Sequence, residues 1–200
     1  IIYVATGENL KKARNFTMPG TGVYRSHNGG DTWSHIGLND TWHIGEIVVH
    51  PNNPDIVLVA AQGHFWSSNE NRGIFRTDDG GKSWNHVLFI DENTGANDIV
   101  FSRANPKIVY ATTWENYPNV NGKKSAVYKS EDAGLIWNKI INGVTINKNT
   151  GRIGIAASYQ DKDKAYIFID QRNQRNGQGT GEVYKTINGG KNWKKTHKEN

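Results

Sequence analysis

Short runs in which apolar and polar residues alternate recur along this chain of 200 residues, and clusters of Gly, Asn, Asp and Pro separate them. Runs of about four to eight such residues between turn-forming clusters predict β-strands. The chain shows no sustained spacing of apolar residues at the helical period of about 3.6, so few helices are expected. The pattern of hydrophobic positions therefore predicts an all-β fold.

The predicted strands belong to a unit of roughly fifty residues that recurs along the chain. Each unit contains a segment with the pattern Ser/Thr-x-Asp/Asn-x-Gly-x-x-Trp, found at 26–33, 77–84, 130–137 and 186–193. The Trp residues of successive segments lie 51, 53 and 56 residues apart. One predicted strand follows each segment and two or three precede it. Four strands in a unit of this length are typical of one blade of a β-propeller.

We therefore predict four-stranded antiparallel blades over 41–91, 92–142 and 143–200 and a partial blade over 1–40, all in one propeller segment. The chain has no initiator Met or secretory leader, and its first five residues already resemble a strand. The sequence is thus expected to begin inside a folded domain. We expect the remaining blades of a larger ring to come from the same chain or from another chain.

The recurring segment, an Asp box, predicts a hairpin between the third and fourth strands of a blade. Its Asp or Asn side chain is expected to accept hydrogen bonds from the turn's own N–H groups, while its Gly residues permit positive φ. Its Trp is expected to be buried between blades, which is worth ~3–5 kcal/mol relative to Ala. Because these residues recur once per blade, we interpret them as structural and not catalytic. They are Ser26, Asn28, Gly30, Trp33, Thr77, Asp79, Gly81, Trp84, Ser130, Asp132, Gly134, Trp137, Thr186, Asn188, Gly190 and Trp193.

Composition narrows the classes of function. The chain has no cysteine, which excludes disulfides and thiolate chemistry. No apolar run approaches the ~20 residues of a membrane helix, so membrane insertion is not expected. The net charge of +5 is modest, and its C-terminal lysines are explained by a solvated strand edge. Since no nucleic-acid-binding motif accompanies them, no nucleic-acid partner is predicted.

Candidate functional residues lie in the loops between second and third strands and between blades. These loops are expected on the rim opposite the Asp boxes, and loops on a rigid fold commonly carry function. Aromatic side chains beside polar groups suit sugar rings and peptides alike, although they also suit capping of the blade cores. The candidate ligand-binding residues are Trp42, His43, His64, Trp66, Trp114, Tyr117, Arg152 and Arg172, and the candidate acids are Glu8, Glu115 and Asp170.

Metal binding is not favoured by the spacing of these residues. His43 and His64 fall in different predicted blades without the spacing of zinc ligands. The oxygen-rich segment 91–98 is a possible calcium loop, but it lacks the pattern of an EF-hand. No metal site or cofactor is predicted, apart from this possible calcium.

Several segments resemble the bacterial Asp-box (BNR-repeat) propeller proteins, which are related to the sortilin ectodomain and often labelled glycosyl hydrolases. They are 22–33, 43–54, 72–84 and 111–114, and the resemblance covers essentially the whole chain. Sortilin-like relatives imply capture of peptides and an extracytoplasmic location, whether secreted, periplasmic or cell-surface. Such a resemblance is specific for the fold and much less so for activity.

Enzymes with this repeat require residues that the chain matches only in part. The sialidase pattern has three Arg around a carboxylate, and only Arg152 and Arg172 fall on the expected rim. Xyloglucan-hydrolysing enzymes look to carry an Asp soon after a strand like 3–6, where this chain has Glu8. A glycosidase also needs two carboxylates roughly 5–10 Å apart.

Three hypotheses remain open from the sequence. The favoured one is a non-catalytic recognition propeller that binds protein segments or glycans on the loop-rich rim or in the channel. The second is a glycoside hydrolase of sialidase or xyloglucanase type that uses the three candidate acids. The third is a structural module of a large secreted protein.

Overall fold

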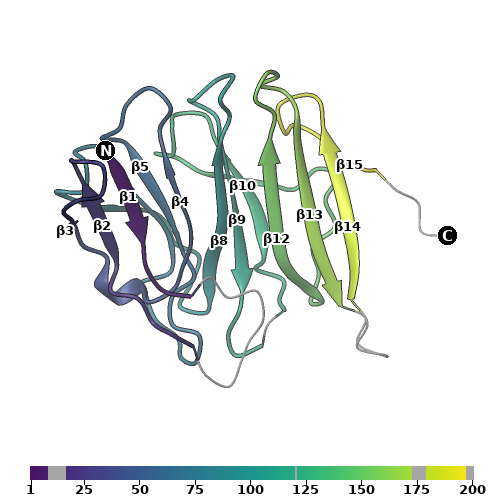
Figure 1. Ribbon diagram of the computed structural model, residues 1–200. Coiled ribbons are helices and arrows are strands. Elements are labelled where there is room, and N and C mark those ends of the chain that lie inside the picture. Colours follow the sequence, from purple (N-terminus) through teal and green to yellow (C-terminus); the bar gives the residue numbers. More distant parts are fainter. Residues whose placement is uncertain (9–16, 120, 173–178, 197–200) are drawn as a thin grey trace.

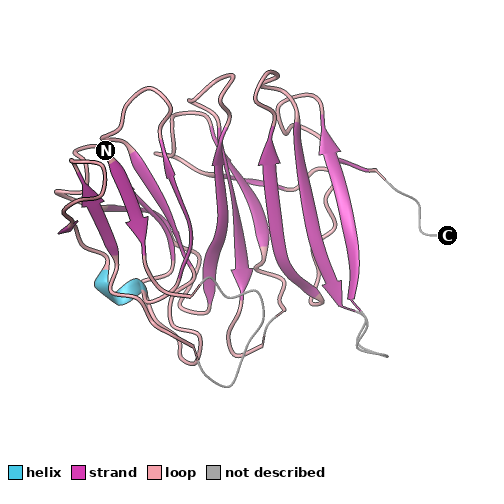
Figure 2. Ribbon diagram, in the orientation of Figure 1, coloured by secondary structure: helices cyan, strands magenta, loops and turns pink. Residues whose placement is uncertain are grey.

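The computed structural model describes residues 1–8, 17–119, 121–172 and 179–196. Over these residues the chain forms four antiparallel β-sheets that stand side by side in sequence order, and each sheet is a meander of consecutive strands (Figure 1). Strands and loops make up almost all of the described chain, in which η1 (Asn39–Thr41) is a single short helix (Figure 2). The predicted all-β architecture of propeller blades is confirmed.

The four sheets, here called blades 1 to 4, follow the predicted repeat. Blade 1 contains β1 (Ile2–Ala5), β2 (Val23–Ser26) and β3 (Ser34–His35). Blade 2 contains β4 (Ile44–Val49), β5 (Val57–Ala61), β6 (Gly73–Thr77) and β7 (Asn85–Leu88). Blade 3 contains β8 (Thr94–Phe101), β9 (Val109–Glu115), β10 (Ala126–Ser130) and β11 (Asn138–Ile140). Blade 4 contains β12 (Thr150–Ala157), β13 (Ala165–Arg172), β14 (Gly179–Thr186) and β15 (Lys194–Lys195).

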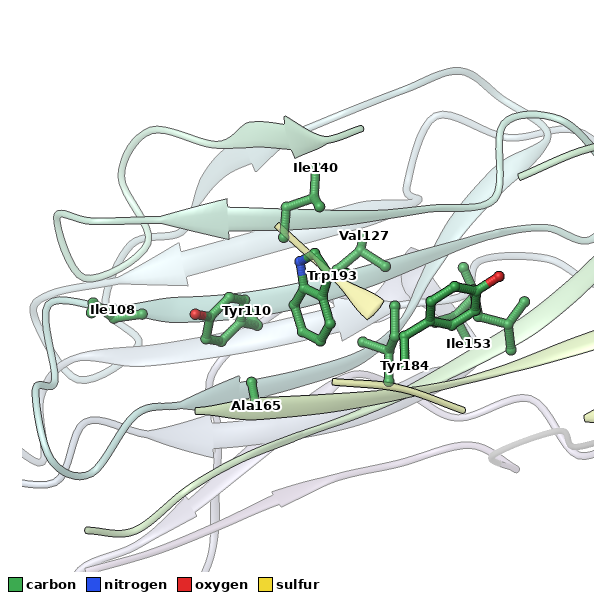
Figure 3. Packing of buried hydrophobic residues seen from close by; sticks show 10 residues of the cluster. Ile108, Tyr110, Val127, Ile140, Ile153, Ala165, Tyr184 and Trp193 are labelled. Atoms are coloured by element: carbon green, nitrogen blue, oxygen red, sulfur yellow. The ribbon is translucent and has the colours of Figure 1, made fainter. Parts of the chain in front are cut away.

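The hydrophobic cores lie between neighbouring blades. In blade 2, every residue of β5 is buried, because both faces of this sheet are covered by another blade. That is why the strand has an uninterrupted apolar sequence instead of an alternating one. Between blades 3 and 4, Tyr110 and Val127 meet Ile153, Tyr184 and Trp193 from the opposing sheet (Figure 3). Each sheet thus supplies one wall of each core that it borders.

The Asp boxes form the predicted turns, in which the Asp or Asn side chain accepts hydrogen bonds from backbone N–H groups of the same turn. In all four, the Asp or Asn Oδ1 accepts the backbone N–H of the residue four positions later, at 2.9–3.1 Å. The hydroxyl of the first residue donates to the same oxygen and accepts the N–H of the Gly four positions after it. In the second box, Thr77 makes these two bonds with Asp79 and Gly81. A hydrogen bond from the Ser83 hydroxyl, together with the Ser83 N–H, holds the pKa of Asp79 well below its usual range. Ile136 offers only its N–H at the equivalent position of the third box.

The four box Trp residues differ in burial, which the repeat alone did not predict. Trp193 is 2% exposed, and Trp84 donates its Nε1–H to the Ile36 carbonyl of blade 1 at 2.6 Å. Trp137 packs against the core between blades 2 and 3. Trp33 is 42% exposed, so the expectation of burial is wrong for this copy. The box Trp residues of blades 2 to 4 pack towards the preceding blade, whereas the described chain contains no blade before blade 1 for Trp33 to pack against.

Blades 2 to 4 are joined towards the inner edge of the fan by buried hydrogen bonds. The Gln62 side chain donates to Asn97 Oδ1 at 3.1 Å, and Asn97 Nδ2 donates to the Ile153 carbonyl at 3.2 Å. Thr112 Oγ1 donates to the same carbonyl at 2.7 Å. Blades 2, 3 and 4 are therefore held in fixed positions relative to one another.

Replacing Trp193 by Ala is expected to lower the free energy of unfolding by ~3–5 kcal/mol, because it empties a filled space between blades 3 and 4. Trp33→Ala is the matched control at the same position of the repeat, and we expect it to cost less than ~1 kcal/mol because its ring is already half in water. Urea denaturation measures both. Equal losses for the two variants would contradict the assignment of the core.

Candidate functional site

The two ends of the blades carry different structures. At one end, the Asp boxes of blades 2 to 4 contact the turn between the first and second strands of their blade, for example through Gly80 N–H to the Asp55 carbonyl at 3.0 Å. We call this end the turn rim. The opposite end carries η1, loop 62–72 and the described residues 6–8, 17–22, 116–119 and 121–125, along the lower edge of Figure 1. We call it the loop rim, and most of the sequence-predicted site residues lie on it.

A fully buried arginine shapes the centre of the loop rim. The Arg72 guanidinium donates to the carbonyls of Gln62 and Ser67 at 2.7 and 2.9 Å, and also to the carbonyl of His64 and to Asn116 Oδ1. Burial lowers its pKa to about 10. These bonds fold loop 62–72 around one side chain and tie it to blade 3. Arg72 thus replaces water as the partner of carbonyls that this loop would otherwise leave buried and unpaired.

The Arg72 side chain lies so close to the loop backbone that it restricts which residue can occupy position 63. Gly63 has φ +77°, and a Cβ built on it would lie 2.4 Å from Cγ of Arg72. No larger residue fits there without moving the arginine. The sequence around Gly63 is therefore dictated by the buried cation beside it.

An exposed aromatic pair lies beside this loop. Trp42 occupies the centre of a γ-turn at φ 52°, ψ −57°, closed by a hydrogen bond from His43 N–H to the Thr41 carbonyl at 2.6 Å. This conformation is rare and strained for a bulky residue. The indole stacks on the His64 ring with centroids 3.8 Å apart and remains 39% exposed. His64 is positioned in turn by a bond from its Nε2 to the Asp40 carbonyl at 3.1 Å.

A second set of rings, most of them buried, comes from residues next to this pair in the chain and from blade 3. Phe65 is 2% exposed and meets His43, Trp66 and Trp114 edge-on at 5.6–6.2 Å. Arg152 lies 5.9 Å from the Trp114 ring, and burial lowers its pKa. Within this set Trp66 alone points outwards, with 54% of its surface exposed.

The structure thus divides the predicted ligand-binding residues into exposed and supporting groups. Trp42 stacks on the half-buried His64 at the surface, and Trp66 is exposed two positions further along the same loop as His64. His43 and Trp114 are buried, at 1% and 3% exposure, so their predicted direct contact with a ligand is not available in this conformation. Burial lowers the pKa of His43, whose ring nitrogens bond to the Gly63 carbonyl and the Thr17 hydroxyl.

The remaining candidates lie further along the rim. Tyr117 is half-buried on the loop after β9. Arg152 falls within β12 and not in the predicted loop between blades. Arg172 ends β13, and its side chain lies outside the described part of the chain.

The three candidate acids come from three different blades. Glu8 follows β1 and accepts the Met18 N–H at 3.3 Å. Glu115 ends β9 and accepts the Lys124 N–H at 2.9 Å. Asp170 was expected at the start of a loop, but it lies inside β13, paired with Gly181 of β14. Two of the three carboxylates therefore hold loop backbone.

Two carboxylates that the sequence analysis missed do interact. Glu46 and Asp98 occupy equivalent positions of β4 and β8, at the inner edge. Burial raises the pKa of both, and the charge of Asp98 raises that of Glu46 further. Asp98 also accepts the Ile155 N–H of blade 4 at 3.0 Å. Aligning Gly45-Glu46-Ile47 with Asn97-Asp98-Ile99 would have revealed the pair.

Neither metal hypothesis gains a ligand set from the structure. Among the described residues no group of three or more His, Cys, Asp and Glu side chains is arranged to hold a metal ion. In the segment considered for calcium, Asp91 pairs with Lys124 at 2.5 Å. Asp98 lies in the middle of β8 and bonds across to blade 4. The two carboxylates thus face different partners.

Residues 21–180 match the profile of a family described as "Sortilin-Vps10: Sortilin, neurotensin receptor 3". The chain belongs to the Sortilin-Vps10 family. A comparison with curated protein sequences finds no match. No helix in the described ranges of this family member has the length and apolar character needed to span a membrane.

Solved structures similar to this Sortilin-Vps10 chain include three GH74 proteins. The Niastella koreensis GH74 enzyme superposes with a TM-score of 0.64 at 20% identity, over 87% of this chain and 26% of that one. An ancestral GH74 enzyme gives 0.64 at 21% identity, over 90% and 22%. The Xanthomonas campestris GH74 xyloglucanase gives 0.60 at 16% identity, over 90% and 27%. The chain spans about a quarter of the length of each, and the likeness establishes the fold alone.

Replacing Arg72 by Lys is expected to lower the free energy of unfolding by about 3 kcal/mol or more, because a single ammonium leaves several buried acceptors unpaired. Arg103→Lys, on an exposed turn, is the control, and we expect a change within about 0.5 kcal/mol. Urea denaturation and limited proteolysis of loop 62–72 give the readouts. An Arg72→Lys protein as stable as the control would refute the role of the guanidinium.

Proposed function

We propose that this Sortilin-Vps10 chain is part of a recognition propeller that binds protein segments or glycans on its loop rim. The observations that carry the proposal are the Trp42–His64 stack, with Trp42 exposed, and the exposed Trp66 on the loop that also holds His64. Exposed aromatic rings of this kind supply a large apolar contact area with little conformational freedom to lose on binding. Such groups are enriched where proteins meet ligands.

The rigidity of the support favours binding over a merely structural role. Trp42 is held at the centre of a strained γ-turn, and its own carbonyl accepts the Gly20 N–H at 2.7 Å. A Cβ on Gly7 would lie 2.0 Å from the same carbonyl oxygen, so three segments converge on one residue. Backbone strain of this kind clusters at functional sites, where a fold keeps a side chain in a set position. Blade packing alone does not require an indole to face water.

Glycoside hydrolysis is the second candidate, and the Glu46–Asp98 pair favours it. Interacting carboxylates with raised pKa values suit general acid catalysis. The carboxylates first considered for this chemistry, Glu8 and Glu115, instead hold backbone N–H groups of their own loops. Hydrolysis, if present, is thus better assigned to the inner edge than to the loop rim.

The location and the assembly partners belong to the same proposal. Resemblance to sortilin-type ectodomains supports a site outside the cytoplasm, which we propose here. The exposed apolar side chains at the two ends of the described fan, Ile2 and Val4 on β1 and Phe168 on β13, support packing against further blades of the same chain or another one.

Trp66→Ala and Trp42→Ala are each expected to weaken binding at the loop rim by about tenfold or more, because anchors of this type dominate binding energy. The full-length protein is tested by titration with hits from a glycan array and a random-peptide library. Trp33→Ala, an exposed indole on the turn rim, is the matched control and should leave affinity unchanged. Saturable binding that survives both loop-rim substitutions would exclude this site, and absence of any saturable ligand would favour a structural module.

Alanine at Glu8, Glu115 or Asp170 is expected to leave any release of sugar from xyloglucan or sialylated oligosaccharides unchanged, because these side chains lie in three separate blades. Quantifying released sugar for the full-length protein and each variant tests this. Loss of turnover in a folded Glu46→Gln protein would establish hydrolysis at the inner edge. Loss at one of the first three would restore the rim acids as catalytic.

A further inference from the structure

A groove lies at the turn rim, at the opposite end of the blades from the aromatic pair. It has a volume of about 560 Å³ and is formed where the first strands of blades 2, 3 and 4 run into their following turns. Its size lies within the range of roughly 300–1,000 Å³ that is typical of ligand sites. The groove is open to solvent, since Val49 on its floor is 39% exposed and Tyr159 at its mouth 67%.

The repeat places equivalent residues from three blades in this groove. Its floor includes the last residue of each first strand, and its mouth includes the residue two positions later. The floor residues are Val49, Phe101 and Ala157, and the mouth residues are Pro51, Arg103 and Tyr159. The same structural position thus carries an imino acid, a cation and an aromatic ring.

The side chains of the mouth residues do not make the hydrogen bonds that close the turns. In each turn another side chain, two positions after the mouth residue, accepts the backbone N–H of the residue two positions further on, at 3.0–3.2 Å. These acceptors are Asn53, Asn105 and Asp161, which are chemically alike as the shared turn geometry requires. The mouth positions differ freely, which indicates that folding leaves them available for recognition.

The chemistry of the groove is apolar with a cationic mouth. The Arg103 guanidinium lies 4.6 Å from the centre of the Tyr159 ring and, among the residues that the structure describes, has no hydrogen-bonding or ion-pair partner. His50 packs edge-on against Phe101 at 5.3 Å. The groove lining contains no Asp or Glu. An apolar occupant with a nearby negative charge would therefore be complementary to it.

We propose that this groove docks an extended segment of a partner protein that carries a large apolar side chain next to an Asp or Glu. The apolar side chain lies on the floor formed by Val49, Phe101 and Ala157, and the carboxylate pairs with Arg103. Tyr and Arg at the mouth are the residue types that contribute most to protein interfaces. Because the walls come from three successive blades, an extended chain fits along the groove better than a compact ligand.

The test uses the full-length protein and a random-peptide library with blocked ends, selected on the wild-type protein. Peptides that bind here are expected to share an apolar–acidic pair and to lose about tenfold or more in affinity on Tyr159→Ala or Arg103→Glu. Gln160→Ala, in the same exposed turn, is the matched control and should leave affinity unchanged. Thermal unfolding of each variant verifies that the fold is intact.

Charge reversal provides the decisive arm. Selection on the Arg103→Glu protein is expected to yield peptides with Lys or Arg in place of the acidic residue. The proposal is overturned if no selected peptide depends on Tyr159, or if reversal of Arg103 leaves the charge preference unchanged. It is also overturned if the wild-type protein self-associates through this surface and Tyr159→Ala abolishes that association, since the occupant would then be a second copy.

Discussion

Every blade of this molecule depends on its neighbours to cover its two faces. A four-stranded antiparallel sheet has no core of its own, and here the buried clusters all lie between sheets. The consequence is visible strand by strand. β5 is apolar throughout because blade 2 is covered on both sides, whereas β1 alternates between exposed and half-buried residues at the open end of the fan. The burial of each Asp-box Trp follows the same rule.

Polar groups complete what apolar packing begins. Gln62, Asn97 and Asp98 connect three blades along the inner edge through side-chain hydrogen bonds. At the loop rim Arg72 performs the equivalent task for an irregular segment, because four acceptors converge on one guanidinium. The exposed aromatic pair therefore rests on a buried network and not on a mobile loop. Rigid support of this kind reduces the entropy lost on binding.

The repeat made most of the fold predictable, because its signals are local. The spacing of the box Trp residues predicted the blades. Asp or Asn at the third box position predicted the hydrogen bonds within the turns. The site was less accessible to sequence reasoning, because burial depends on residues distant in the chain. Nothing near Trp114 or His43 indicates that Phe65 covers them, and nothing near Arg72 shows that Asn116 receives its hydrogen bond. The Glu46–Asp98 pair was not predicted, because candidate acids were expected in loops and both of these residues lie within strands.

The turns between first and second strands have a consequence for how such a chain diversifies. In each turn Asn53 or its counterpart accepts a backbone N–H, and among the described residues the side chain two places before it makes no hydrogen bond. When a blade is duplicated, the copy inherits a stable turn together with one free position that already points to a common groove. Mutation at Pro51, Arg103 and Tyr159 can then change the chemistry of the groove and leave these turn hydrogen bonds in place. A ring built in this way acquires new specificities by copying blades, and its stability changes little in the process.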